Sequence, residues 1–386
     1  MPTGVPRQSA RHISSLDGFR GIAFLLVFMR HYALSTHTES AILHAGMTIG
    51  SGGWIGVDLF FALSGFLITG ILLDTRRTKG YFRNFFARRI LRIVPLYYGV
   101  FVLLLLLTPI LHLQWHRGHL LYLVYLGNIA YVTNTSLGQI APDVSLIHFW
   151  SLAVEEQFYL IWPCIIFFVA RRRQLVWVCV GLSVLALAIR IVLLATLPAW
   201  YAYEWCYALL PTRMDGLLYG ALAAVWVRSR PVESIQPIAR RISLAAGVAL
   251  AGIFAVGGFN FHSRSMTLAG YPILAALFAS VLLQALVPHS WAFRLGNVRI
   301  LRFFGKYSYG LYVYHALFFP GLSRLMPVLQ RECHSLILGG LLYVSLVFVG
   351  SVVAAVASYQ LYEKHWLALK RYFAYKEPAS VETHAA

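Results

Sequence analysis

The sequence has few charged residues. They make up 12% of its 386 residues, about half of the roughly 25% that is usual in soluble globular proteins. Hydrophobic residues make up 59%, and the mean hydropathy is +0.69. A chain of this length with so little charge cannot cover a water-facing surface. A soluble globular protein is therefore excluded, and we expect a protein that crosses the lipid bilayer several times.

Several chemical signatures are also missing. The four cysteines form no CxxC pair and show no metal-ligand spacing, which excludes a disulfide framework. The sequence contains no GxGxxG, Walker A, HExxH or GxSxG motif. Nothing in it therefore indicates nucleotide hydrolysis, zinc chemistry or a serine-hydrolase nucleophile, and we expect no bound metal.

What the chain does contain is long apolar stretches. Ten of them are long enough for a transmembrane helix, and they begin near residues 18, 55, 93, 147, 174, 213, 243, 267, 307 and 336. An eleventh stretch, at 119–131, is short, and we interpret it as a re-entrant or interfacial helix. The expected fold class is all-α, a polytopic membrane protein with about ten transmembrane helices.

Basic residues outnumber acidic ones by 32 to 14. With ten spans, 24 of the 32 fall on one side of the membrane, whereas the loops 35–54, 132–146 and 198–212 on the other side contain no Lys or Arg. The positive-inside rule then places both termini in the cytoplasm. Orientation accounts for most of the excess charge, so nucleic acid is not needed as a partner.

This topology predicts a simple domain organisation. A cytoplasmic N-terminal tail covers residues 1–15, a single membrane domain covers 16–366, and a cytoplasmic C-terminal tail covers 367–386.

Ionisable groups inside spans are costly, so each is a functional candidate. Arg20 and His31 in the first span are eleven residues apart, which puts them on one helical face about 16 Å apart along the axis. Asp58, near the outer end of the second span, lies at a depth similar to His31 and could hold its imidazole in one tautomer. The alternatives are an interfacial role for His31 and a favourable helix N-terminal charge for Asp58.

Two consecutive carboxylates, Glu155 and Glu156, lie well inside the stretch HFWSLAVEEQFYLIWP at 148–163. Pairing with an arginine would explain one of them but not both.

A basic run, YFRNFFARRILRIVPLYY, begins at residue 81. In it Arg88 and Arg92 share a helical face, and Arg89 is adjacent. Arginines interleaved with aromatic residues can bind phosphates and stack on a planar ring. Membrane orientation or anionic lipid is the alternative explanation.

Two further stretches are weaker candidates. Tyr309, Tyr312 and His315 follow one another along GKYSYGLYVYHALFF at 305–319, and His315 is either a second acid or base or a hydrogen-bonded interface residue. Ser64, in the second span, lies among glycines and could serve helix packing.

Five stretches in this order resemble the acyltransferase 3 family of bacterial membrane O-acyltransferases. They are LDGFRGIA with its Arg-x10-His spacing, GVDLFFALSGFLIT, RRILRIVP, HFWSLAVEEQFYLIWP and YSYGLYVYH. The resemblance implies a ten-helix domain in the bacterial cytoplasmic membrane, of the stand-alone kind without a C-terminal esterase-like domain. Such a domain moves an acyl group, usually acetyl, from cytoplasmic acyl-CoA. The acceptor is a hydroxyl of a cell-envelope glycan or lipid-linked saccharide, or in some members a small, macrolide-like metabolite.

The resemblance also implies roles for single residues. They are His31 as the essential base with Arg20 as its partner, Arg88, Arg89 and Arg92 for the CoA phosphates, Glu155 and Glu156 as active-site carboxylates, and the tyrosines of YSYGLYVYH as candidate transient acyl acceptors. A direct transfer and a two-step route through an acyl-enzyme both stay open. A transporter or flippase of lipid-linked sugars, with the two glutamates as a proton relay, is the alternative from another class.

Overall fold

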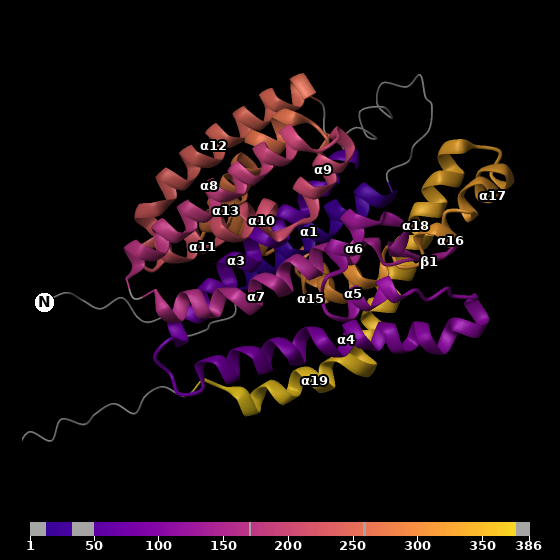
Figure 1. The fold of residues 1–386 in the computed structure, drawn as a ribbon, viewed down its shortest axis with the longest axis horizontal. Helices are drawn as coiled ribbons and strands as arrows, with labels where there is room; N and C mark the ends of the chain where they lie inside the picture. Colours follow the sequence, from indigo (N-terminus) through magenta and orange to yellow (C-terminus); the bar gives the residue numbers. More distant parts are fainter. Residues whose placement is uncertain (1–12, 33–49, 170, 258–259, 376–386) are drawn as a thin grey trace, which may run out of the picture.

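The computed structural model describes residues 13–32, 50–169, 171–257 and 260–375. This part of the chain is a bundle of helices with one small antiparallel hairpin, formed by β1 (Gln139–Ala141) and β2 (Val144–Ser145). The all-α, polytopic membrane fold is confirmed. The helices α8 and α12 lie at one edge of the bundle, and α4 lies at the opposite edge with α19 along it (Figure 1).

Each predicted span coincides with a helix. These helices are α1 (Ser14–Tyr32), α3 (Ile55–Thr75), α4 (Tyr81–Leu111), α7 (Trp150–Phe168), α8 (Arg172–Thr196), α11 (Asp215–Val227), α12 (Val232–Gly257), α13 (Tyr271–Ala285), α15 (Arg299–Tyr314) and α18 (Leu336–Ser358). Within the described ranges, seven helical segments are long and apolar enough to cross a membrane. Helices α11 and α15, with 13 and 16 residues, are shorter than this. The total of ten spans therefore stays a prediction.

Shorter elements join the long helices. They are η1 (Gly52–Trp54), η2 (Arg117–His119), α5 (Leu120–Leu123), α6 (Gly127–Thr133), η3 (Thr135–Gly138), η4 (Ile147–Phe149), α9 (Ala199–Ala208), α10 (Leu210–Arg213), η5 (Met266–Gly270), α14 (Trp291–Gly296), α16 (Phe319–Leu322), α17 (Leu325–Glu332), η6 (Tyr359–Glu363), α19 (Lys364–Ala368) and η7 (Leu369–Phe373). The stretch at 119–131 falls in α5 and α6, of four and seven residues. Neither can cross a bilayer, as expected for a stretch that does not span.

Helix α4 begins at Tyr81 rather than near residue 93. The basic run is thus the first part of one 31-residue helix and not a loop between two spans. Its charges lower the local hydropathy, which is why the apolar pattern placed the start of the helix too late.

Close helix crossings hold the centre of the bundle together. A Cβ atom added at Gly21 would lie 2.1 Å from the carbonyl oxygen of Leu301 in α15, and one added at Gly65 would lie 1.9 Å from that of Leu217 in α11. Small residues commonly allow such approaches in membranes, so close helix packing accounts for Gly65 beside Ser64. The crossings bring α1, α3 and α15 together around one interior space.

The basic clusters after the second, fourth and sixth predicted spans meet at one end of the bundle. Arg76 Nη2 donates to the Phe167 carbonyl at 2.7 Å, Arg172 donates to the Arg228 carbonyl, and Arg228 forms an ion pair with Asp74 at 2.6 Å. This agrees with the sidedness predicted from charge. Which side faces the cytoplasm stays a prediction.

The chain beyond α18 turns back along α4 (Figure 1). Arg88 Nη1 donates to the Lys370 carbonyl at 3.1 Å, and Asn84 Nδ2 donates to the Ala374 carbonyl at 3.2 Å. The first part of the predicted tail at 367–386 is therefore packed structure. Residues 376–386 of that tail, and 1–12 of the N-terminal tail, lie outside the described residues.

Candidate active site

A strongly basic cavity of about 770 Å³ opens at one end of the bundle. Its basic lining residues are Arg20 from α1, Arg88, Arg89 and Arg92 from α4, Arg299, Arg302 and Lys306 from α15, and Lys370 from η7. Among the described residues its one acidic lining residue is Asp17, which forms an ion pair with Arg20 at 2.6 Å. So much positive charge around one cavity suits a ligand with several phosphates.

The cavity contains the three predicted phosphate-binding arginines and four basic residues that sequence reasoning missed. Arg299, Arg302 and Lys306 were interpreted only as markers of orientation. Their spacing of three and four residues places them on one helical face, so a signal was present. Lys370 reaches the cavity only because the C-terminal segment folds back, which no local pattern indicates.

A smaller inner cavity of about 120 Å³ lies next to the basic one. Arg20, Arg89 and Arg92 line both cavities. The predicted site residues Ser64, Glu155, Glu156, Tyr309 and Tyr312 also line the inner cavity, whereas Asp58 of α3 and His315 do not. Residues separated by up to about three hundred positions in the chain thus meet around one polar chamber inside the bundle.

The glutamates face this chamber with hydroxyl groups beside them. The Ser64 and Tyr159 hydroxyls are 2.5 Å apart, and the Glu155 carboxyl group lies beside both. The Arg89 guanidinium lies 5.2 Å from the centre of the Tyr159 ring. In the part of the chain that the structure describes, no basic side chain forms an ion pair with Glu155 or Glu156 within 4.0 Å. An ion pair with an arginine would have been a structural explanation for one of the two glutamates. No such ion pair is found among the described residues.

Two tyrosines connect the chamber to neighbouring helices. Tyr309 donates to the Ile93 carbonyl of α4 at 2.9 Å. Tyr312 donates to the His148 carbonyl at 3.0 Å, and its hydroxyl also contacts that of Ser151.

Three histidines cluster beside Tyr312, and none of the three is among the described residues that line the inner cavity. His315 follows α15 directly, and its ring centre lies 4.9 Å from that of His31 and 5.4 Å from that of His148. Tyr312, which lines the chamber, lies 5.5 Å from His315, ring centre to ring centre. Helix α1 therefore carries Arg20 at the basic end and His31 at the histidine end, as the eleven-residue spacing predicted.

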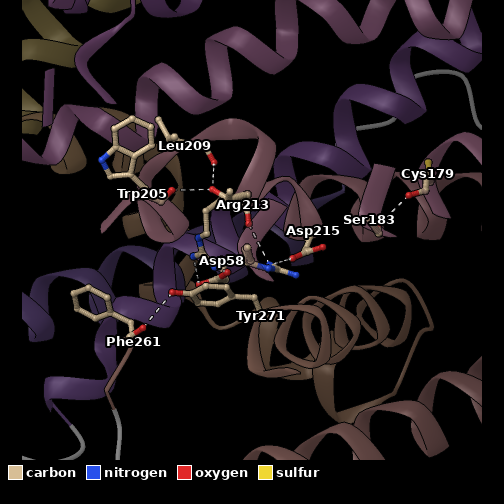
Figure 2. Close-up of polar contacts among 11 residues, drawn as sticks. Asp58, Cys179, Ser183, Trp205, Leu209, Arg213, Asp215, Phe261 and Tyr271 are labelled. Carbon is tan, nitrogen blue, oxygen red and sulfur yellow. Dashed lines mark hydrogen bonds and ion pairs between the residues drawn. The ribbon is translucent and has the colours of Figure 1, made fainter. Parts of the chain in front are cut away.

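The predicted partnership between Asp58 and His31 is wrong. The Asp58 carboxylate lies 2.9 Å from Arg213 Nη2, and both side chains are buried (Figure 2). A buried guanidinium is strongly destabilising without a counter-charge. Asp58 therefore pairs with Arg213 of α10. The residue beside His31 is His315.

The neighbouring charges are paired in the same way. Asp215 forms an ion pair with Arg190, whose Nη1 also donates to the Thr212 carbonyl at 3.1 Å. The Arg213 guanidinium lies 3.9 Å from the centre of the Tyr271 ring (Figure 2). These contacts join α3, α8, α10 and α13, so this group of charges holds helices together.

Comparisons with known proteins bear on the family of this chain. A family model described as an acyltransferase domain matches residues 13–360. The chain is 28% identical over 348 residues to the peptidoglycan O-acetyltransferase OatA of Listeria monocytogenes, covering 84% of this chain and 51% of that protein. It is 31% identical over 346 residues to YrhL of Bacillus subtilis, provisionally named a peptidoglycan O-acetyltransferase, covering 83% of this chain and 50% of that protein.

The chain thus spans about half the length of the curated relatives it matches. No solved structure is significantly similar to it. Because the family model covers most of the chain, including both cavities' residues on α1, α3, α4, α7 and α15, this protein belongs to the acyltransferase 3 family.

Proposed function

We propose that this protein transfers an acetyl group from acetyl-CoA to a hydroxyl of a cell-envelope glycan or lipid-linked saccharide. The observation that carries the proposal is that the two cavities share three arginines. Among the described residues, eight basic side chains surround the outer cavity, and the inner one is lined by Tyr312, whose ring centre lies 5.5 Å from that of His315. CoA carries a 3′-phosphate and a diphosphate, which arginine and lysine bind well. The names of the relatives support a glycan acceptor.

In this proposal the CoA phosphates occupy the basic cavity and the acetyl thioester extends into the inner chamber. The acceptor approaches from the histidine end. His31 takes the proton of the acceptor hydroxyl as its oxygen bonds to the thioester carbon, the C–S bond breaks, and the departing thiolate receives the proton. Arg20, Arg89 or Arg92, which line both cavities, would stabilise the negative charge that develops on the carbonyl oxygen.

The basic end faces the cytoplasm of a bacterial cell in this proposal, because acyl-CoA is found there. Both termini then lie on that side of the cytoplasmic membrane. The acceptor reaches His31 from the opposite side.

The proposal is tested with inverted membrane vesicles that contain the full chain, radiolabelled acetyl-CoA and endogenous envelope glycans. We expect label to appear in the glycan fraction as an alkali-labile ester, with mass spectrometry showing an added acetyl group. Labelling of a small secreted metabolite instead would overturn the choice of acceptor. Movement of intact lipid-linked sugar without acetyl-CoA and without label would overturn the enzyme in favour of a flippase.

A further inference from the structure

The histidine cluster contains hydrogen bonds that fix where the ring protons lie. His31 Nδ1 is 2.9 Å from the Val27 carbonyl oxygen. A carbonyl oxygen can only accept, so Nδ1 must carry the hydrogen. In the neutral ring the lone pair is therefore on Nε2.

His315 is oriented in the same way. Its Nδ1 is 2.8 Å from the Tyr312 carbonyl oxygen, so this nitrogen also carries the hydrogen and Nε2 is the acceptor. That Nε2 lies 3.4 Å from His31 Nδ1. The Nδ1–H group of His31 is thus shared between the Val27 carbonyl and the His315 ring.

Packing holds the His315 ring in place. Its side chain is buried, with 1% of the residue exposed, and the Phe24 ring meets it edge-on at 5.9 Å. Tyr32 donates to the His315 main-chain carbonyl. On the other side, His148 donates from Nε2 to the Val313 carbonyl at 3.0 Å and packs its ring against His315. His315 cannot turn its Nε2 away from His31 without disturbing these contacts.

We propose that His315 is a positioning residue that, together with the Val27 carbonyl, holds the His31 ring in one orientation by accepting from its Nδ1–H group, so that the Nε2 lone pair serves the acceptor hydroxyl. The same contact persists after proton transfer, because Nδ1–H donates in both the imidazole and the imidazolium. His315 thereby orients the catalytic histidine through its Nδ1–H group, as the carboxylate does in hydrolase triads. This inference rests on the proposed function, in which His31 is the base.

Two conservative variants separate positioning from simple packing. In His315→Gln the side-chain oxygen replaces Nε2 and can still accept from His31. In His315→Asn the amide replaces Nδ1 and can still donate to Tyr312, but it is too short to reach His31. We expect the Asn variant to lose at least about 10-fold in kcat, within the roughly 10²–10⁴-fold that general-base catalysis contributes. The Gln variant retains most of the rate, and KM for acetyl-CoA is unchanged in both.

Equal rates in the two variants, or a better rate with Asn, would overturn the inference. Wild-type protein and His31→Ala are measured beside them. If the wild type transfers no label, or His31→Ala is fully active, it is the proposed function that fails rather than the role of His315.

A direct measurement covers the case in which the variants do not fold. Histidine labelled with ¹⁵N in the wild-type protein reports the tautomer by solid-state NMR, with the His31 signals assigned by their loss in His31→Ala. We expect an unprotonated Nε2 at His31 and a protonated Nδ1 whose ¹⁵N signal also reports the hydrogen bond to His315 Nε2. The opposite tautomer would contradict the proposal.

Discussion

Charged side chains lie inside the helical bundle in two regions. Between α3, α8 and α10, the carboxylates of Asp58 and Asp215 are each paired with a buried arginine. Between α3, α4 and α7, Glu155 and Glu156 line a chamber that shares three arginines with the basic cavity. Both regions look alike in sequence, since each places carboxylates within apolar stretches. Burial alone therefore does not tell a functional charge from a structural one, because both regions contain buried charges. What marks the functional site is a charge that faces a cavity and has no ion-pair partner among the described residues.

The largest effect on stability is expected in the paired region. Asp58→Ala leaves Arg213 buried without its counter-charge, which costs about 3–5 kcal/mol of folding free energy. Unfolding of the detergent-solubilised protein, followed by circular dichroism, measures this loss. Asp58→Leu combined with Arg213→Met removes both charges and should recover most of the stability. A single variant as stable as the wild type would show that the pair does not hold the helices.

Substitution of a glutamate in the chamber should lower activity and leave stability nearly unchanged. Glu155→Gln keeps the shape of the side chain and removes a charge that has no ion-pair partner in the described part of the chain, so stability should change by less than about 1 kcal/mol. We expect acetyl transfer to fall by about 10²-fold, the lower end of what a positioned acid or base contributes. Glu156→Gln is the matched variant next to it. If both variants lost folding stability rather than activity, the two glutamates would have a structural role like that of Asp58 and Asp215.

Basic residues that line only the outer cavity should affect donor binding alone. Arg302→Gln removes one of the eight basic lining residues and should raise KM for acetyl-CoA by roughly 5- to 10-fold, about the value of one charge-assisted hydrogen bond. Arg294→Gln is the control, because this exposed arginine of α14 does not line the cavity. An equal effect from both variants would indicate a general effect of charge and not a defined site.

The smallest effect is expected at the outer ion pair between Asp74 and Arg228. Their side chains are 37% and 24% exposed, and such pairs contribute only about 0.2–1 kcal/mol. Asp74→Asn should therefore barely change unfolding or activity. A loss of stability as large as that of Asp58→Ala would show that buried and exposed ion pairs contribute equally to folding in this protein.

Sequence reasoning predicted the helices well because hydropathy and length decide whether a segment spans a membrane. It also predicted the meeting of basic clusters at one end, since charge distribution follows orientation. Its error at the start of α4 arose where a helix continues beyond its apolar part through Arg83 and Arg88.

The partners of single residues were harder to predict. Arg20 and His31 lie on one helix, so their spacing was enough to align them. Asp58 and Arg213 are 155 positions apart, and His31 and His315 are 284 apart. Which of several histidines and carboxylates meet depends on how α1, α3, α10 and α15 cross, and a single sequence does not contain that information in a local pattern.

Acetyl transfer per folded molecule in His31→Ala tests the account most directly. His365→Ala is the matched control, because this histidine lies exposed on α19, outside the cluster of His31, His148 and His315. Both variants are purified, and their unfolding temperatures are measured to show that they are folded equally well. They are then assayed with radiolabelled acetyl-CoA. The account predicts a loss of about 10²-fold or more in His31→Ala, from removal of the general base, and wild-type activity in His365→Ala. A folded His31→Ala protein that transfers acetyl at the wild-type rate would contradict it.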